Sequence, residues 1–340
     1  MPNCPHGSAR CGTACSNVRS DPAFQPLSTR LFPKFEGADA YALTGLAARC
    51  DWVVLSDRKA PYVADRVRTD IRSVRTVFVS MRAHEHALAH FFDTVLPQLT
   101  SPFVLVTGSE DITLPRQIDQ RWPSLDAGLR GKLTGLLDNP LLVHWFCENL
   151  DEKSHPRQSP LPLGMVYPHA RTDVRVEVPE WGGSGQKHPR ILCAHRVRDG
   201  GQWEPRRRVT ELAKSHWRSF VTVLEEPVDE AEFEALIRNH AFVLCVEGGG
   251  LDPSPKAWQT LLNGSIPVMR RTAVSEAYTV FPSVQVDDWA PEALSADKLD
   301  DWFDTFYRNG YLARERPAII EKLGIDYWWR RIQACLAGQA

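Results

Sequence analysis

The sequence lacks a long hydrophobic run. No stretch of its 340 residues approaches the roughly 20 consecutive apolar residues that a membrane-spanning helix needs. The N-terminal segment contains Arg10 and Arg19 but no apolar core of the kind found in signal peptides. We therefore expect a soluble, cytoplasmic protein without a transmembrane segment, and peripheral contact with a membrane stays open.

The sequence also lacks an excess of charge of either sign. It has 40 Lys and Arg against 42 Asp and Glu, which gives a formal net charge of −2. A balance of this kind creates no overall field that would draw the protein to nucleic acid, so we expect no nucleic-acid partner. Any anion-binding site must therefore come from a local cluster of basic residues and not from the net charge of the protein.

Cysteine is too sparse and scattered for a disulfide framework, with eight in the whole chain. Cys193 and Cys245 lie in apolar runs, where a reduced thiol packs as a small hydrophobic group. Near the N-terminus, four soft-metal ligands occur within twelve residues, and these are Cys4, His6, Cys11 and Cys15. Their spacing matches no standard zinc template, so we expect incidental thiols, with a structural zinc site as the alternative.

Two motifs of nucleotide-dependent enzymes are missing. The chain has no Gly-x-Gly-x-x-Gly motif, which argues against a nicotinamide cofactor, and no Asp-x-Asp pair near a nucleotide motif. We expect an enzyme that requires no metal or organic cofactor, in which Lys and Arg take the place of a cation.

The most informative segment that is present covers residues 241–269. The apolar run Ala241–Val246 predicts a buried strand, and the glycines 248–250 permit close approach of a ligand to the backbone. Lys256 follows near the start of a short helix that ends at Gly264, and Ser265–Met269 predicts the next strand. A lysine beside a helix N-terminus is suited to binding a diphosphate.

Alternating apolar strands and helical patterns on both sides of a Pro- and Gly-rich stretch, 156–189, predict an α/β protein with two Rossmann-like lobes facing a cleft and a helical C-terminus. We expect a loosely ordered lead-in over 1–36, an acceptor-side lobe over 37–180 and a nucleotide-sugar-binding lobe over 186–316. Residues 317–340 are expected to form a helix that packs back on the first lobe.

The donor segment resembles that of exostosin-type glycosyltransferases and is distantly similar to that of α-1,3-fucosyltransferases. The matching residues are Gly250-Leu-Asp252, Lys256-Ala-Trp258 and Gly264-Ser-Ile-Pro-Val268. In the first half, Phe103–Asp111 through Pro115, His144–Asn149 and Ser159–Gly164 resemble the ordered signatures of bacterial and viral exostosin-like chains. The chain departs from the exostosin pattern with Lys256 in place of arginine, Gln259 in place of glutamate and Val246-Glu247 in place of Ser/Cys-Pro.

This resemblance, with the local patterns, gives candidate residues for the donor side. Lys256 is the candidate to offset charge on a departing diphosphate. Glu247 and Asp252 flank the glycines and are candidates to bind ribose or sugar hydroxyls, and arginines after the first strand of the second lobe can hold a phosphate. The donor-binding candidates are Arg196, Arg206, Arg208, Glu247, Gly248, Gly249, Gly250, Asp252 and Lys256.

An inverting transfer needs a base that takes the proton of the acceptor hydroxyl. Asp111 is the leading candidate because it follows a strand and lies in the exostosin-like signature. The predicted catalytic residues are Asp111, Glu247 and Lys256, and the acceptor-side candidates are Asp57, His144, Glu148 and Asn149.

The sequence thus favours a glycosyltransferase that moves a sugar from a nucleotide-sugar donor to a glycan, lipid-linked or protein acceptor in polysaccharide biosynthesis, without metal and with inversion. The alternative is a catalytically inactive sugar- or nucleotide-binding partner of a glycan-assembly complex.

Overall fold

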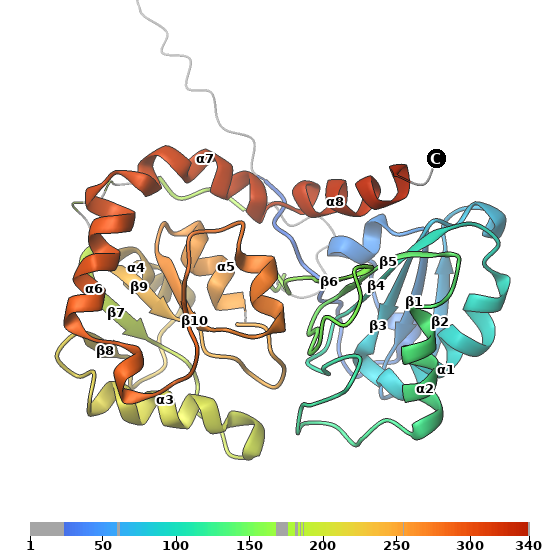
Figure 1. Cartoon of the computed structure of the whole chain (residues 1–340), viewed down its shortest axis with the longest axis horizontal. Coiled ribbons are helices and arrows are strands. Elements are labelled where there is room, and N and C mark those ends of the chain that lie inside the picture. The colour runs from blue at the N-terminus through green and yellow to red at the C-terminus, as the bar shows by residue number, and fades with distance from the viewer. Residues whose placement is uncertain are drawn as a thin grey trace, which may run out of the picture.

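A computed structural model describes residues 24–59, 62–167, 176–180, 183, 185, 187–253 and 255–338. Two α/β lobes lie side by side, and the C-terminal helices run along one edge of the molecule from the second lobe to the first (Figure 1). Each lobe is built on a mostly or wholly parallel sheet. The predicted fold class is confirmed.

The N-terminal lobe contains a six-stranded sheet of order β2-β1-β3-β4-β5-β6, in which β2 alone is antiparallel to its neighbour. Its inner strands are continuous hydrophobic runs, as is usual when both faces of a parallel sheet are covered. The strands are β1 (Trp52–Ser56), β2 (Val63–Val67), β3 (Thr76–Ser80), β4 (Phe103–Gly108), β5 (Leu142–Cys147) and β6 (Gln158–Pro160).

Two helices of this lobe follow strands β3 and β4. Helix α1 (His84–His90) continues into a π-helical turn, Phe91–Val95. Helix α2 (Ala127–Leu136) begins after Asp126, whose side chain accepts a hydrogen bond from the Leu129 amide and so caps the helix.

The C-terminal lobe contains a five-stranded, wholly parallel sheet of order β11-β10-β9-β7-β8. The strands are β7 (His188–Cys193), β8 (Val221–Val223), β9 (His240–Leu244), β10 (Ile266–Arg270) and β11 (Val284–Val286). The chain adds β8 on one side of β7 and then β9 on the other, so the order reverses between β7 and β9. In open parallel sheets, the crevice at the carboxyl ends of such a strand pair is the usual ligand site.

The helices that follow are α3 (Glu204–Lys214), α4 (Glu230–Asn239), α5 (Pro255–Leu262), α6 (Ala296–Phe303), α7 (Tyr311–Leu323) and α8 (Ile325–Ala337). Helix α5 is fixed by Trp258, which is fully buried and whose Nε1 donates a 3.0 Å hydrogen bond to the Leu323 carbonyl. The tryptophan of the donor motif is therefore a packing residue that joins α5 to the end of α7.

Helix α8 returns to the N-terminal lobe. It contacts β4, β5 and the 3₁₀ turn Gly45–Arg49, where Arg49 forms a 2.6 Å ion pair with Asp326. Trp328 of this helix is buried. The C-terminal segment thus links the two lobes (Figure 1).

Part of the expected lead-in is not loosely ordered. Leu27 and Leu31 have no exposed surface, and the backbone of Leu27 bonds to the Leu323 carbonyl and to the Met165 amide. The Thr29 amide bonds to the Leu163 carbonyl in the same way. The segment from residue 24 runs between the lobes, so the first folded residues lie well before Gly37, the predicted start. Its Pro-rich sequence lacks periodicity because it pairs by isolated bridges rather than in a strand.

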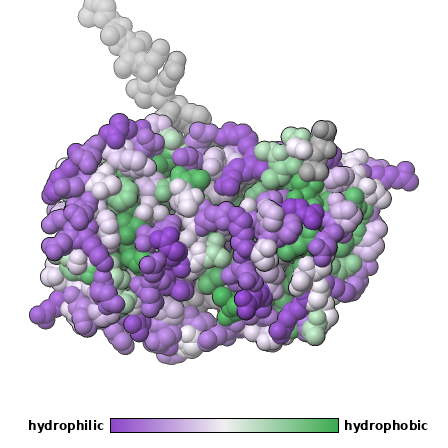
Figure 2. All heavy atoms as spheres, in the orientation of Figure 1, coloured by the Kyte–Doolittle hydropathy of each residue, from purple (hydrophilic) through white to green (hydrophobic). Residues whose placement is uncertain are grey.

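Cys4, His6, Cys11 and Cys15 lie outside the described residues, so the structure does not test the zinc alternative. In the described part of the chain, no helix has the length and apolar character required to cross a bilayer. The face seen in Figure 2 is largely hydrophilic, and its hydrophobic side chains form separate groups.

The interlobe segment generates a stability prediction. Leu27→Ala removes a fully buried side chain at the junction, so we expect it to lower the free energy of unfolding by about 2–5 kcal/mol. Ile118→Ala, at a side chain that is 54% exposed, is the control and should change it by less than about 0.5 kcal/mol. Urea unfolding followed by tryptophan fluorescence measures both. Equal, small effects would show that the segment contributes little to folding.

Candidate functional site

Lys256 lies in the crevice between β7 and β9. Its ammonium affects the pKa of Cys193, the last residue of β7, of Cys245, which directly follows β9, and of His195. Burial lowers the pKa of Lys256 to about 8, the thiol of Cys245 counteracts this, and Arg206 lowers it further. The predicted phosphate-binding lysine is therefore at the switch point of the sheet. Burial at this position disfavours its protonated, positively charged form.

Arg206 is the second cation of this crevice. It belongs to the first turn of α3, and its guanidinium donates hydrogen bonds to the carbonyls of Glu247 (3.0 Å) and Val246 (3.3 Å). Its guanidinium carbon lies 5.0 Å from the centre of the Trp203 ring, and that of Arg198 lies 5.1 Å from it. Trp203, which was not predicted as a site residue, therefore lies close to two arginines and beside the glycine loop.

Glu247 does not offer an open carboxylate to a ligand. It is 4% exposed, and its two oxygens accept hydrogen bonds from Arg270 Nε and, at 3.1 Å, from Trp289 Nε1. Arg208 donates to the Trp289 carbonyl at 2.7 Å. Glu247 and Arg208 therefore stabilise the wall of the crevice through internal hydrogen bonds. Either residue would have to break these bonds before it could contact a ligand.

The glycine loop fits against the N-terminal lobe. A Cβ added to Gly249 would lie 2.9 Å from Asp111 Oδ2, and one added to Gly250 would lie 2.4 Å from Asn149 Oδ1. A Cβ on Gly248 would lie 3.2 Å from a terminal nitrogen of Arg206. Glycines were predicted here for approach of a ligand, but the contacts that exclude a side chain at 249 and 250 come from the other lobe.

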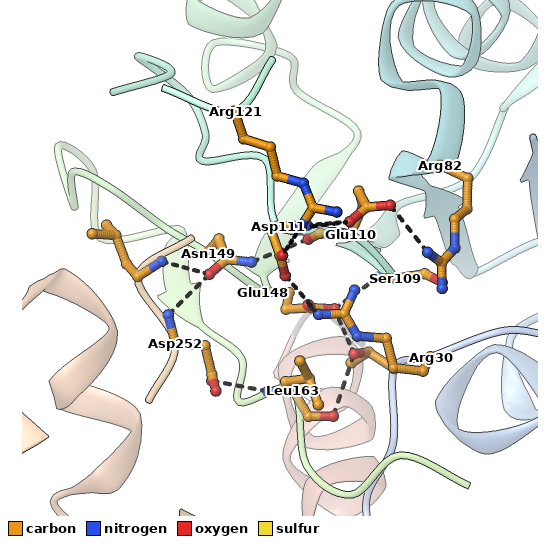
Figure 3. A network of polar contacts seen from close by, with 12 residues as sticks. Arg30, Arg82, Ser109, Glu110, Asp111, Arg121, Glu148, Asn149, Leu163 and Asp252 are labelled. Atoms are coloured by element: carbon orange, nitrogen blue, oxygen red, sulfur yellow. Dashed lines mark hydrogen bonds and ion pairs between the residues drawn. The ribbon is translucent and has the colours of Figure 1, made fainter. Parts of the chain in front are cut away.

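Asn149 and Asp252 join the lobes at this point. The Asn149 side-chain oxygen accepts hydrogen bonds from the amides of Leu251 (2.9 Å) and Asp252 (3.0 Å). The Asp252 carboxylate accepts in turn from the Leu163 amide (3.1 Å) and the Tyr278 hydroxyl (3.2 Å). Both predicted site residues hold the donor loop to the first lobe (Figure 3). Asn149 of the first lobe accepts from the loop backbone, and Asp252 of the loop accepts from the Leu163 amide of the first lobe.

A network of alternating charges lies behind this loop (Figure 3). The Arg30 guanidinium is 2.9 Å from Asp111 Oδ1 and 3.2 Å from Glu148 Oε1. Asp111 also pairs with Arg121, and Glu110 lies 3.0 Å from Arg82. Asp111 and Glu148 were predicted site residues. The arginines that hold them, Arg30 and Arg121, were not predicted, and Arg30 lies 81 positions from Asp111 in the sequence.

The two carboxylates differ in acidity. Burial alone would raise the pKa of Asp111, but Arg30 and Arg121 lower it to below its usual range. Burial raises the pKa of Glu148 to about 7, even though Arg30 and the hydrogen bonds from Thr29 and the Ser109 amide oppose it. Asp111 is therefore ionised and a weak base, whereas Glu148 titrates near neutrality but is 2% exposed.

Two acceptor-side candidates do not join this group. Asp57 is buried and accepts hydrogen bonds from the Phe35 amide (2.9 Å) and the Tyr41 hydroxyl, so it shapes the loop after residue 34. His144 lies in the middle of β5 with Nε2 2.9 Å from Ser159 Oγ, and burial, Lys153 and Arg331 lower its pKa to about 4. Hydrogen bonds within the N-terminal lobe engage both oxygens of Asp57 and the Nε2 of His144.

Arg196 lies exposed in the loop after β7. His195, next to it, was not predicted; burial first and Lys256 second lower its pKa to about 3, and its Nε2 lies 3.0 Å from Thr210 Oγ1. Among the described residues, no group of three or more His, Cys, Asp and Glu side chains is arranged to hold a metal ion.

Comparisons with known proteins leave the family open. No protein-family model matches the chain, and no curated protein matches it. One similar solved structure is the spinosyn rhamnosyltransferase SpnG complexed with thymidine diphosphate, with 12% sequence identity and a TM-score of 0.36 over 76% of this chain and 73% of that chain. Similarity at this level establishes neither a shared family nor a shared activity.

The acidity of Glu148 generates a pH prediction. Its pKa rises from 4.5 in an unfolded chain to about 7 in the folded protein, so the folded state binds the extra proton and loses stability as pH rises through this window. Glu148→Gln removes this loss. The stability of the variant relative to the wild type should increase between about pH 4.5 and 7 and then stay constant.

Asp111→Asn is the matched control. The pKa of Asp111 is lowered from 3.8, so the contribution of this carboxylate to stability is lost only below about pH 4. The difference in free energy of unfolding between Asp111→Asn and the wild type should therefore be constant between pH 4.5 and 7. Urea unfolding at several pH values gives both curves. A flat curve for Glu148→Gln would show that Glu148 ionises normally.

Proposed function

We propose that the protein is a glycosyltransferase that moves a sugar from a nucleotide-sugar donor to a saccharide-containing acceptor, without a metal ion and with inversion at the transferred carbon. The observation that carries the proposal is the cationic crevice of Lys256 and Arg206 at the switch point between β7 and β9. The exostosin-like donor segment supports it, because that segment forms this crevice.

The donor diphosphate would lie against Lys256, with Arg206 and exposed Arg198 and Arg196 around it. Burial disfavours the charged form of Lys256, and a bound diphosphate would favour that form. When the bond between the sugar carbon and the diphosphate oxygen breaks, charge accumulates on the leaving diphosphate, and Lys256 offsets that charge. The Trp203 ring holds the guanidinium groups of Arg198 and Arg206 beside this position.

On the acceptor side, a hydroxyl oxygen forms the new bond to the sugar carbon and gives its proton to a base. Asp111 is our proposed base because its Oδ2 lies at the glycine loop, where the lobes meet. Its low pKa makes it an inefficient base in the closed geometry. Separation from Arg121 on acceptor binding would make it stronger.

We infer a cytoplasmic location for this reaction. The described cysteines Cys50, Cys147, Cys193, Cys245 and Cys335 are all reduced, which suits a reducing compartment.

The rival function, a binding partner without catalysis, is favoured by one observation. Both oxygens of Asp111 are paired with arginines, and both oxygens of Glu247 are hydrogen-bonded within the C-terminal lobe. A protein that only binds a nucleotide or sugar would keep this arrangement unchanged.

The donor site is tested by binding of nucleoside diphosphates as a function of pH. We expect one of UDP, GDP, dTDP, ADP and CDP to raise the Tm, and its affinity to fall by up to about tenfold per pH unit above pH 8 as Lys256 loses its proton. Lys256→Ala should abolish the shift. Calorimetric titration between pH 6.5 and 9.5 gives the dissociation constants.

Lys256→Arg is the matched control, because guanidinium stays charged over the whole range. It should keep binding and remove the pH dependence. No Tm shift with any of the five nucleotides, or equal pH dependence in wild type and Lys256→Arg, would contradict the proposed donor site.

Asp111→Asn separates catalysis from binding. We expect turnover of the bound sugar nucleotide to fall by about 10²–10⁴-fold, with the diphosphate dissociation constant within about twofold of the wild type. Single-turnover assays with sugars of the nucleotide that binds measure the rate, and Arg121→Met, which frees Asp111 from one cation, should raise the pKa seen in the rate profile. Unchanged turnover in Asp111→Asn would eliminate Asp111 as the base.

A further inference from the structure

Aromatic and guanidinium groups alternate in a row at the carboxyl edge of the N-terminal sheet. The Arg58 guanidinium carbon lies 5.9 Å from the centre of the Phe35 ring and 3.6 Å from that of the Trp122 ring. The Arg121 guanidinium carbon in turn lies 5.0 Å from the Trp122 ring centre, and Arg121 pairs with Asp111. This aromatic row, Phe35-Arg58-Trp122-Arg121, therefore leads from the lobe surface to the proposed base.

Phe35 forms the outer end of the row. Among the described residues, no large hydrophobic side chain is more exposed than Phe35, at 57%. A single exposed hydrophobic side chain is ordinary, but the φ of Phe35 is 62°, in the left-handed region that bulky residues rarely adopt. Strained backbone of this kind persists only where the surroundings hold it, and it gathers at ligand-binding sites.

A buried carboxylate holds Phe35 in this conformation. Asp57 is 1% exposed, and its oxygens accept hydrogen bonds from the amides of Phe35 (2.9 Å) and Lys59 (3.1 Å). Asp57 directly precedes Arg58, so one residue fixes both the exposed ring and the neighbouring guanidinium. The predicted acceptor-side residue Asp57 thus shapes the aromatic row without offering its own oxygens to a ligand.

Arg58 is accessible to a ligand. It is exposed, and its N–H groups make no hydrogen bond or ion pair with a described residue. Arg58 and Trp122 line a pocket of about 260 Å³, which provides space for a ring beside the guanidinium. Guanidinium N–H groups are donors that hydroxyl oxygens can accept from. Glu85 lines the same pocket, so this surface favours a neutral ligand with many hydroxyls over an anion.

We propose that the aromatic row binds a neutral acceptor saccharide of two or more rings, with its reacting end near Asp111 and a following ring on Phe35 and Arg58. A saccharide presents a C–H face that packs on an aromatic ring and hydroxyls that accept from guanidinium. The row contains several side chains in succession, so it is longer than a single sugar ring. The acceptor role rests on the proposed function, whereas the binding of a saccharide does not.

The test uses saturation-transfer NMR on the full chain with the mono-, di-, tri- and tetrasaccharides of cellulose, laminarin, chitin and mannan. We expect the trisaccharide of one series to bind at least about tenfold more tightly than its monosaccharide, because the outer ring adds an aromatic contact and a hydrogen bond to a charged group. Phe35→Gly and Arg58→Met should each remove this gain.

Matched variants outside the row serve as controls. Val67→Ala, at a hydrophobic side chain of the same lobe that is 45% exposed, and Arg72→Met, at an exposed arginine, should leave the gain intact. Phe35→Tyr keeps the ring and should keep the gain. Glycine adopts a φ of 62° without strain, so Phe35→Gly should keep or raise the Tm of the ligand-free protein. A fall in that Tm would show that the ring serves the fold, and the proposal would be wrong.

Three further results would overturn the proposal: no binding by any of the four series, a gain unchanged in Phe35→Gly or Arg58→Met, and tighter binding of trigalacturonate than of every neutral trisaccharide. The nucleotide experiment is independent. Nucleotide binding without saccharide binding removes the role of the aromatic row alone, and saccharide binding without nucleotide binding removes the proposed transferase.

Discussion

The arrangement of the two lobes depends on one buried cation, Arg30. Its guanidinium lies between Asp111 and Glu148, which follow two neighbouring strands of the N-terminal sheet, and these two carboxylates with Glu110 raise its pKa against the effect of burial. A buried guanidinium without carboxylates would be strongly destabilising, and so would the carboxylates without it. The interlobe segment from residue 24 is thereby fixed by charge at Arg30 and by apolar burial at Leu27 and Leu31. That segment in turn sets the path of the chain at Leu163, which contacts the donor loop through Asp252.

The donor loop is consequently shaped by both lobes. Asn149 accepts two hydrogen bonds from the loop backbone and donates to the Glu110 carbonyl, so the loop and the charge network share one side chain. The glycines at 249 and 250 are required because the N-terminal lobe occupies the space of their side chains. Separation of the lobes would break the Asn149 bonds, each worth about 0.5–1.5 kcal/mol net, and would at the same time expose Asp111. Opening for acceptor entry and exposure of the proposed base would therefore be one movement.

The elements of both lobes followed from local patterns, because continuous apolar runs such as Phe103–Thr107 can only be buried strands in a layered α/β fold. Lys256 was found at the crevice for the same reason: the strand, glycine and helix that place it are consecutive in the sequence. Glu247 was predicted to contact a ligand, and its bonds to Arg270 and Trp289 could not be foreseen because these residues lie beyond the motif. No local signal reveals that Arg30 meets Asp111 across 81 positions.

The two groups whose pKa values lie near neutrality have opposite consequences for the proposed reaction. Below about pH 8 Lys256 is charged, and below about pH 7 Glu148 is neutral, so a fall in pH makes the junction more positive and favours a bound diphosphate. The same positive potential lowers the pKa of Asp111 and makes this carboxylate a weaker base, because Arg30 no longer has an ionised Glu148 to neutralise. Donor binding and proton removal would thus respond to pH in opposite directions. A transferase built in this way would have its optimum between the two pKa values, where Lys256 is still charged and Glu148 is already ionised, and Arg30 influences the lower limit because it pairs with Glu148.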